Sequence, residues 1–155
     1  NLRDNLQLYY TTIKRNASKT LKTQIKLDDL QKKNIIKLTN FTDPISKIFS
    51  SNKGSLNSFG SILHQSWLIK KAINIGTTTR EIDGYYEKAL KNGAIGGKIL
   101  GAGNGGFFLF FIKAKYRAKL EKSLKNLKKL DFEFDNKGSV ITYNDKKWKK
   151  LKKRF

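Results

Sequence analysis

Apolar residues recur along the chain at two kinds of spacing, and these spacings predict a mixture of strands and helices. A run of β-forming residues at 6–11 predicts the first strand. The segments that follow have apolar residues at helical spacing or begin with capping residues. Helices are therefore predicted over 17–27, 29–39, 44–49, 55–73 and 79–92. The clearest is 55–73, where Leu56, Phe59, Leu63 and Trp67 lie close to one stripe.

The C-terminal third has a different pattern. Strands are predicted at 98–100 and at the apolar run 107–112, followed by a basic helix containing Leu120, Leu124 and Leu127. Alternation at 132–134 and 140–143, with a turn sequence at 135–138, predicts a final hairpin. The whole order predicts an α+β fold, a ferredoxin-like antiparallel sheet packed with helices and carrying a helical insertion. We place this domain at 1–144 and interpret 145–155 as a basic C-terminal tail or short helix.

The composition removes several classes of protein. A chain of 155 residues that is 38% hydrophobic can bury a core without cross-links. It has no Cys and one His, which excludes disulfides, cysteine nucleophiles and multi-His metal sites. No apolar run approaches the length of a membrane helix and no signal peptide opens the chain, so we expect a cytoplasmic location without a membrane partner. The absence of Met fits a segment of a longer protein.

The large positive charge suggests a nucleic-acid partner, but the types and positions of the basic residues weaken this interpretation. There are 33 basic and 12 acidic residues, a net charge of +21. Only five of the basic residues are Arg, the residue that base and bidentate phosphate recognition favour. The Lys residues are spread along the chain, which favours a solvated surface that binds polyanions nonspecifically. A basic nucleic-acid-binding module is retained as the alternative.

The most distinctive segment is the glycine-rich stretch 96–107. Glycine clusters allow tight turns and close approach to the backbone, and successive free N–H groups can bind an anion. Asn104 suits such a loop because Asn tolerates a left-handed backbone. The stretch leads into a strand, unlike a dinucleotide-binding fingerprint, and no Lys-Ser or Lys-Thr pair follows it, unlike a Walker loop. A plain hairpin and a phosphate-proximal loop both remain open on this pattern.

Residues 93–107, GAIGGKILGAGNGGF, closely resemble the third conserved motif of the GHMP kinases. The segments 63–70, 9–11 and 15–18 resemble the sugar branch of that superfamily, of the heptose-phosphate kinase or galactokinase type, and the similarity spans 6–143. The resemblance implies the C-terminal domain of an ATP-dependent sugar kinase that acts on a heptose phosphate.

The resemblance also implies what this chain lacks. The family's N-terminal Pro-x-x-x-Gly-Leu-Gly-Ser-Ser phosphate loop does not occur in this sequence. We therefore expect ATP and Mg²⁺ to be held mainly by a missing N-terminal kinase domain, in the same or another chain, and the isolated chain to be inactive. A noncatalytic family member used in assembly is a further alternative.

The resemblance implies a set of site residues without a catalytic residue or a metal ligand in this chain. The residues of the phosphate-proximal loop are Gly101, Ala102, Gly103, Asn104, Gly105 and Gly106. Asn104 departs from the Gly that the family usually has. Arg15, His64 and Lys70 are predicted to bind the sugar or sugar-phosphate substrate. The competing interpretations are a structural hydrogen bond for His64 and an ordinary surface position for Lys70.

Overall fold

The computed structural model describes residues 2–13, 28–50, 55–73 and 75–141. Its strands are β1 (Leu6–Tyr10), β2 (Ala94–Ile99), β3 (Phe107–Ile112) and β4 (Lys128–Leu130). Its helices are α2 (Asp29–Thr39), α3 (Thr42–Ser50), α4 (Leu56–Ile73), α5 (Arg80–Lys91) and α6 (Arg117–Ser123). Short 3₁₀ turns are η1 (Arg3–Asn5), η2 (Ile75–Thr77) and η3 (Ala114–Tyr116). The predicted helix 17–27 and the basic tail lie outside the described residues.

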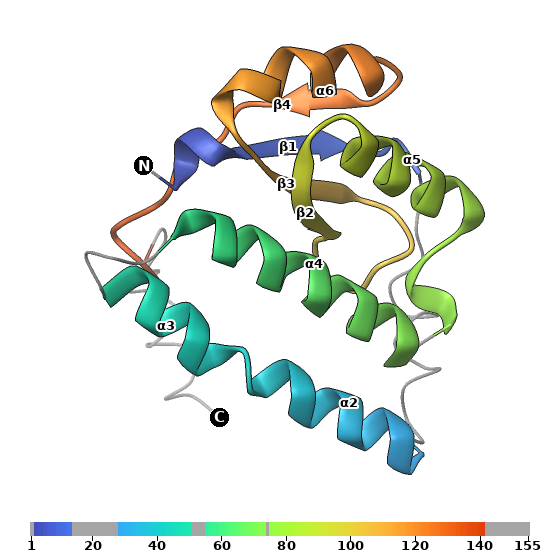
Figure 1. The fold of residues 1–155 in the computed structure, drawn as a ribbon, viewed down its shortest axis with the longest axis vertical. Helices are drawn as coiled ribbons and strands as arrows, with labels where there is room; N and C mark the ends of the chain where they lie inside the picture. Colours follow the sequence, from blue (N-terminus) through green and yellow to red (C-terminus); the bar gives the residue numbers. More distant parts are fainter. Residues whose placement is uncertain (1, 14–27, 51–54, 74, 142–155) are drawn as a thin grey trace, which may run out of the picture.

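The strands form one antiparallel sheet in the order β2-β3-β1-β4. In β1 and β3, Leu6 faces Phe111 and Tyr10 faces Phe107, so the C-terminal end of β1 meets the start of β3. The crossover from β1 to β2 carries helices α2 to α5 (Figure 1). This arrangement confirms the predicted α+β, ferredoxin-like sheet with a helical insertion.

Helices cover both faces of the sheet. Successive side chains of a strand point to opposite faces, and the neighbours Phe110 and Phe111 are both buried. Phe110 belongs to a cluster with residues of α5 and α6, including Ile82 and Leu120. Phe111 belongs to a second cluster, with Leu63 of α4. The consecutive apolar residues of this strand are therefore explained by a sheet buried on two sides.

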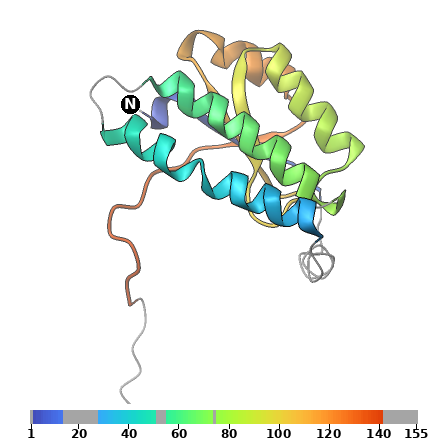
Figure 2. The same ribbon diagram turned by 60° about the horizontal axis from the view of Figure 1, so that its bottom comes forward.

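Helix α4 lies directly against β2. A Cβ at Gly96 would collide with the carbonyl oxygen of Gly60, and a Cβ at Gly60 would lie 2.6 Å from the Phe111 ring. Helix α2 packs on the outer side of α4, where Gln31 donates a 2.6 Å hydrogen bond to the carbonyl oxygen of Ile73 (Figure 2). The two glycines thus set how closely the helical insertion approaches the sheet.

The predicted C-terminal hairpin is wrong. The last described strand is β4, and residues 131–141 contain no strand. Phe134, Val140 and Ile141 are exposed, so the alternation there faces no surface that could bury it. The basic helix ends at Ser123, although Leu124 and Leu127 beyond it are still buried. In the described ranges, no helix is long and apolar enough to cross a membrane.

Candidate functional site

The candidate site is the glycine loop that joins β2 to β3. Four successive residues, Gly103 to Gly106, have positive φ, with Asn104 at 56°. Only Gly, and to a lesser degree Asn, adopts this region without a large steric cost. The loop is closed at its base by a 2.8 Å hydrogen bond from the Leu100 amide to the Phe107 carbonyl. The expected left-handed conformation of Asn104 is therefore confirmed.

The loop is held on two sides by neighbouring backbone. On one side, the Asn104 amide donates a 2.7 Å hydrogen bond to the carbonyl oxygen of Thr77, in η2. On the other, the amide and hydroxyl of Thr11 donate to the Gly106 carbonyl at 2.8 and 3.0 Å. A Cβ at Gly103 would lie 2.6 Å from the Thr77 oxygen. These contacts fix the loop between the end of β1 and the turn after α4.

Lys70 is the one predicted substrate-binding residue that the structure places at the loop. It lies in the last turn of α4, and its ammonium donates a hydrogen bond to the carbonyl oxygen of Gly101. Gly101 is exposed, whereas Gly103, Gly105 and Gly106 are buried. The accessible part of the loop therefore carries a positive charge beside it, which suits a nearby phosphate.

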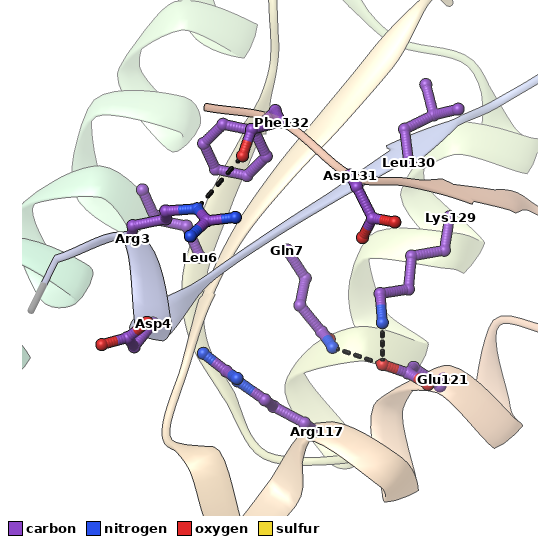
Figure 3. Close-up of a pocket in the computed structure, with 10 residues that line it drawn as sticks. All are labelled: Arg3, Asp4, Leu6, Gln7, Arg117, Glu121, Lys129, Leu130, Asp131 and Phe132. Atoms are coloured by element: carbon purple, nitrogen blue, oxygen red, sulfur yellow. Dashed lines mark hydrogen bonds and ion pairs between the residues drawn. The ribbon is translucent and has the colours of Figure 1, made fainter. Parts of the chain in front are cut away.

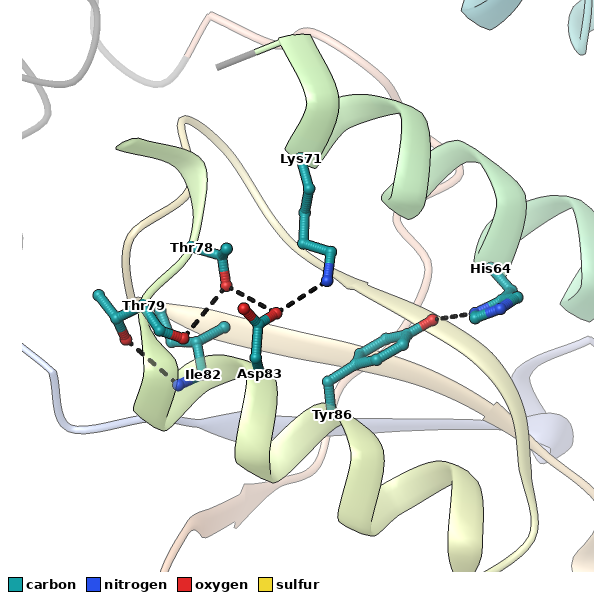
Figure 4. A network of polar contacts seen from close by, with 7 residues as sticks. All are labelled: His64, Lys71, Thr78, Thr79, Ile82, Asp83 and Tyr86. Carbon is teal, nitrogen blue, oxygen red and sulfur yellow. Dashed lines mark hydrogen bonds and ion pairs between the residues drawn. The ribbon is translucent and has the colours of Figure 1, made fainter. Parts of the chain in front are cut away.

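His64 lies elsewhere, against α5. Its Nδ1 is 2.7 Å from the hydroxyl of Tyr86, and the two rings are stacked with centroids 5.8 Å apart (Figure 4). His64 sits over Gly96, about 13 Å along β2 from the loop by the rise of a strand. This geometry agrees with the alternative interpretation of His64, in which the residue makes a structural hydrogen bond. Arg15 lies outside the described residues.

A polar network fixes the turn that holds the loop. Lys71 of α4 and Asp83 of α5 form a 2.9 Å ion pair, and the Thr78 hydroxyl donates to the same carboxylate oxygen at 3.1 Å (Figure 4). Thr79 then caps α5 by accepting a hydrogen bond from the Ile82 amide at 3.2 Å. This network joins α4, the segment after η2 and α5, so it steadies Thr77 next to Asn104.

Sequence analysis missed the two threonines that hold the loop, Thr11 and Thr77. Both are buried, and within the described part of the chain the Thr77 hydroxyl has no hydrogen-bond partner. Thr77 stands between the predicted helices 55–73 and 79–92, and its role depends on a contact with Asn104, 27 residues later along the chain. The signal available in the sequence was the run of threonines at 77–79, which is too common to single out.

The described residues offer little for a metal or for an acid–base role. Among them, no group of three or more His, Asp or Glu side chains could hold a metal ion. Lys98 on β2 is the ionisable residue closest in sequence to the loop, and burial lowers the pKa of its ammonium. That this chain carries backbone near a phosphate, without a catalytic residue or a metal ligand, stays a prediction.

The nucleic-acid alternative finds little aromatic surface on strand β3. Base stacking requires accessible rings on a sheet face. Phe108, Phe110 and Phe111 are buried, and only Phe107 of this strand is exposed, at 38%.

Together, the ferredoxin-like sheet and the left-handed glycine loop between β2 and β3 define a kinase-type C-terminal domain. The family model described as GHMP kinases C terminal matches residues 47–135, more than half of the chain. The chain belongs to this family.

Individual relatives are consistent with that assignment. The D-glycero-alpha-D-manno-heptose 7-phosphate kinase of Campylobacter jejuni is 36% identical over 93 residues, which are 59% of this chain and 26% of the relative. Mevalonate kinase of L. major superposes with a TM-score of 0.62 at 23% identity, covering 78% of this chain and 37% of that one. Mevalonate kinase of Methanococcus jannaschii gives 0.60 at 18%, covering 81% and 37%. The two structures show the fold alone, and the chain spans between 26% and 37% of these relatives' lengths.

Proposed function

We propose that this chain forms the C-terminal domain of an ATP-dependent kinase that phosphorylates a sugar phosphate, of the heptose 7-phosphate type. The glycine loop, residues 101–106, lines the cleft in which the phosphoryl group is transferred. The acceptor class is taken from the Campylobacter jejuni relative, which is 36% identical.

The observation that carries this proposal is the shape of the loop. Four successive positive φ values favour Gly or Asn, so the loop is built almost without side chains. Gly103, Gly105 and Gly106 are buried, whereas Gly101 is exposed and Ala102 and Asn104 are partly exposed, and these three residues are the part of the loop that a ligand can approach. The contacts with Thr77 and Thr11 hold the loop in place before any ligand binds. Because phosphoryl transfer depends mainly on positioning and on charge stabilisation, a fixed backbone surface is a useful contribution.

The remaining parts of the reaction are assigned to a second domain. That domain supplies the phosphate loop, the Mg²⁺ ligands and the groups that act on the acceptor hydroxyl. In this division, the loop and Lys70 support the phosphate and no residue of this chain moves a proton. The 155-residue chain alone is expected to show no turnover.

The test compares two glycine variants in a protein that contains this chain together with its kinase domain. Gly103→Ala introduces a Cβ 2.6 Å from the Thr77 carbonyl oxygen at a positive φ. Gly84→Ala, in α5, introduces a Cβ with nothing within 4 Å. With ATP-Mg and D-glycero-D-manno-heptose 7-phosphate, we expect Gly103→Ala to lower kcat/KM by about a hundredfold, and Gly84→Ala to leave it unchanged.

Circular dichroism establishes that both variants are folded before activity is compared. Full activity of folded Gly103→Ala would show that the loop does not line the reaction site. Measurable phosphorylation by the purified 155-residue chain alone would contradict the division of roles between the two domains.

A further inference from the structure

A cavity lies at the opposite end of β1 from the glycine loop. It has a volume of about 350 Å³ and is built from η1, β1, α6 and β4 (Figure 3). Leu6 and Gln7 line it. Leu6 is five positions before Thr11, which contacts the loop, a distance of about 17 Å along a strand. The cavity is therefore separate from the proposed phosphoryl-transfer site. Its volume is at the lower end of the range for ligand-binding pockets.

Most polar groups of this cavity already have partners. Glu121 of α6 accepts hydrogen bonds from Gln7 at 2.7 Å and from Lys129 at 2.5 Å (Figure 3). Arg3 donates to the Phe132 carbonyl oxygen at 3.2 Å and pairs with Glu133 at 2.5 Å. The side chain of Gln7 is buried, and its amide oxygen accepts a 3.0 Å hydrogen bond from the Tyr9 hydroxyl.

Arg117 is the exception. Its side chain is partly buried, and among the described residues its Nε has no hydrogen-bond partner although water does not reach it. A buried donor without an acceptor is costly, and a guanidinium more so than a neutral group. Asp4 and Asp131, the other carboxylates of the lining, are exposed. Among the described residues, no acceptor, the Glu121 carboxylate of the same lining included, is hydrogen-bonded to this Nε, so a negatively charged acceptor entering the cavity would satisfy it.

We propose that this cavity is a binding site for a small oxyanion, held by Arg117 with Lys129 and Arg3 at its side. The chemistry is that of a phosphate or carboxylate group, which a guanidinium binds through two parallel N–H donors. Because the site does not include the glycine loop, its occupation is independent of the proposed kinase reaction.

The experiment titrates the purified chain with inorganic phosphate and, separately, with acetate, by calorimetry at constant ionic strength near 0.15 M. Constant ionic strength is needed because a net charge of +21 attracts any anion weakly. The variants are Arg117→Gln, Arg117→Lys and Lys119→Gln. Lys119 is exposed on the same helix, so its variant makes the same change of charge outside the cavity.

We expect one saturable site in the wild type. Arg117→Gln should raise Kd by about tenfold or more. Arg117→Lys should raise it by a smaller factor, because Lys keeps the charge but lacks the two parallel N–H donors of the guanidinium. Lys119→Gln should raise Kd by less than about twofold. Saturation by phosphate or by acetate identifies which oxyanion the cavity prefers. Absence of saturation with both anions would overturn the proposal. If Arg117→Gln does not fold, equal losses of anion affinity in Arg117→Lys and Lys119→Gln would also overturn it.

Discussion

Asn104 is the only residue with a side chain beyond Cβ in the left-handed part of the loop. Its φ of 56° is one that Asn adopts at low cost, whereas a β-branched residue adopts it only with strain. We expect Asn104→Gly to leave the free energy of unfolding within about 0.5 kcal/mol of the wild type, and Asn104→Val to lower it by about 1–2 kcal/mol. Urea unfolding measures both variants. Equal stability of the Gly and Val variants would show that the loop does not hold this conformation in solution.

Gly96 is a residue whose size alone sets the distance between α4 and β2. A Cβ there meets the carbonyl oxygen of Gly60 and the backbone of His64, and neither can rotate away. Gly96→Ala is therefore expected to lower the free energy of unfolding by about 3 kcal/mol. Gly84→Ala is the matched control, since its Cβ enters open space on a helix and should stabilise by up to about 1 kcal/mol. The prediction fails if the two alanine variants change stability alike.

At the scale of elements, the ion pair of Lys71 and Asp83 joins α4 to α5 beside the loop. Its side chains are about one-quarter and one-third exposed, so solvent screening leaves a coupling of about 1 kcal/mol. A double-mutant cycle with Lys71→Met and Asp83→Asn measures it by chemical unfolding. Asp83 also lies in the first turn of α5, where a negative charge is favourable, so Asp83→Asn alone should cost more than Lys71→Met alone. Additive effects of the two variants would mean that the pair contributes no coupling.

The elements also show which parts of the fold the sequence could predict. Helix α4 was predicted because its apolar stripe is continuous, and α5 because Thr79 caps it and Asn92-Gly93 follow its end. The hairpin was predicted from alternation, but residues 132–141 form no strand, and Phe134, Val140 and Ile141 are exposed. Local pattern identifies an element only where tertiary packing uses that pattern.

The candidate site divides in the same way. Its glycine loop was visible because the composition of 101–106 is unusual in itself. Thr11 and Thr77, which hold it, were not visible, because each acts through a contact with a distant segment. The Arg117 cavity was equally hidden, since four separate elements contribute to it.

At the scale of the whole molecule, two buried tyrosines control stability in alkali. Burial raises the pKa of both Tyr9 and Tyr86 well above the usual value of 10. Below pH 10 both residues are neutral in the folded and unfolded states, so they contribute no pH dependence. Above it, the unfolded chain loses these protons while the folded chain keeps them. The free energy of unfolding should therefore fall as pH rises, by up to about 2.7 kcal/mol per pH unit for two groups.

Lys98 acts in the opposite direction and sets where this fall begins. Burial lowers its pKa, so the charged ammonium costs stability at neutral pH and the cost is relieved as pH rises toward its unfolded value near 10.5. Urea unfolding between pH 8 and 12 measures the combined curve. Tyr9→Phe/Tyr86→Phe should reduce the alkaline slope while leaving the Lys98 contribution. An unchanged slope in that double variant would show that other groups, and not these two hydroxyls, limit the fold in alkali.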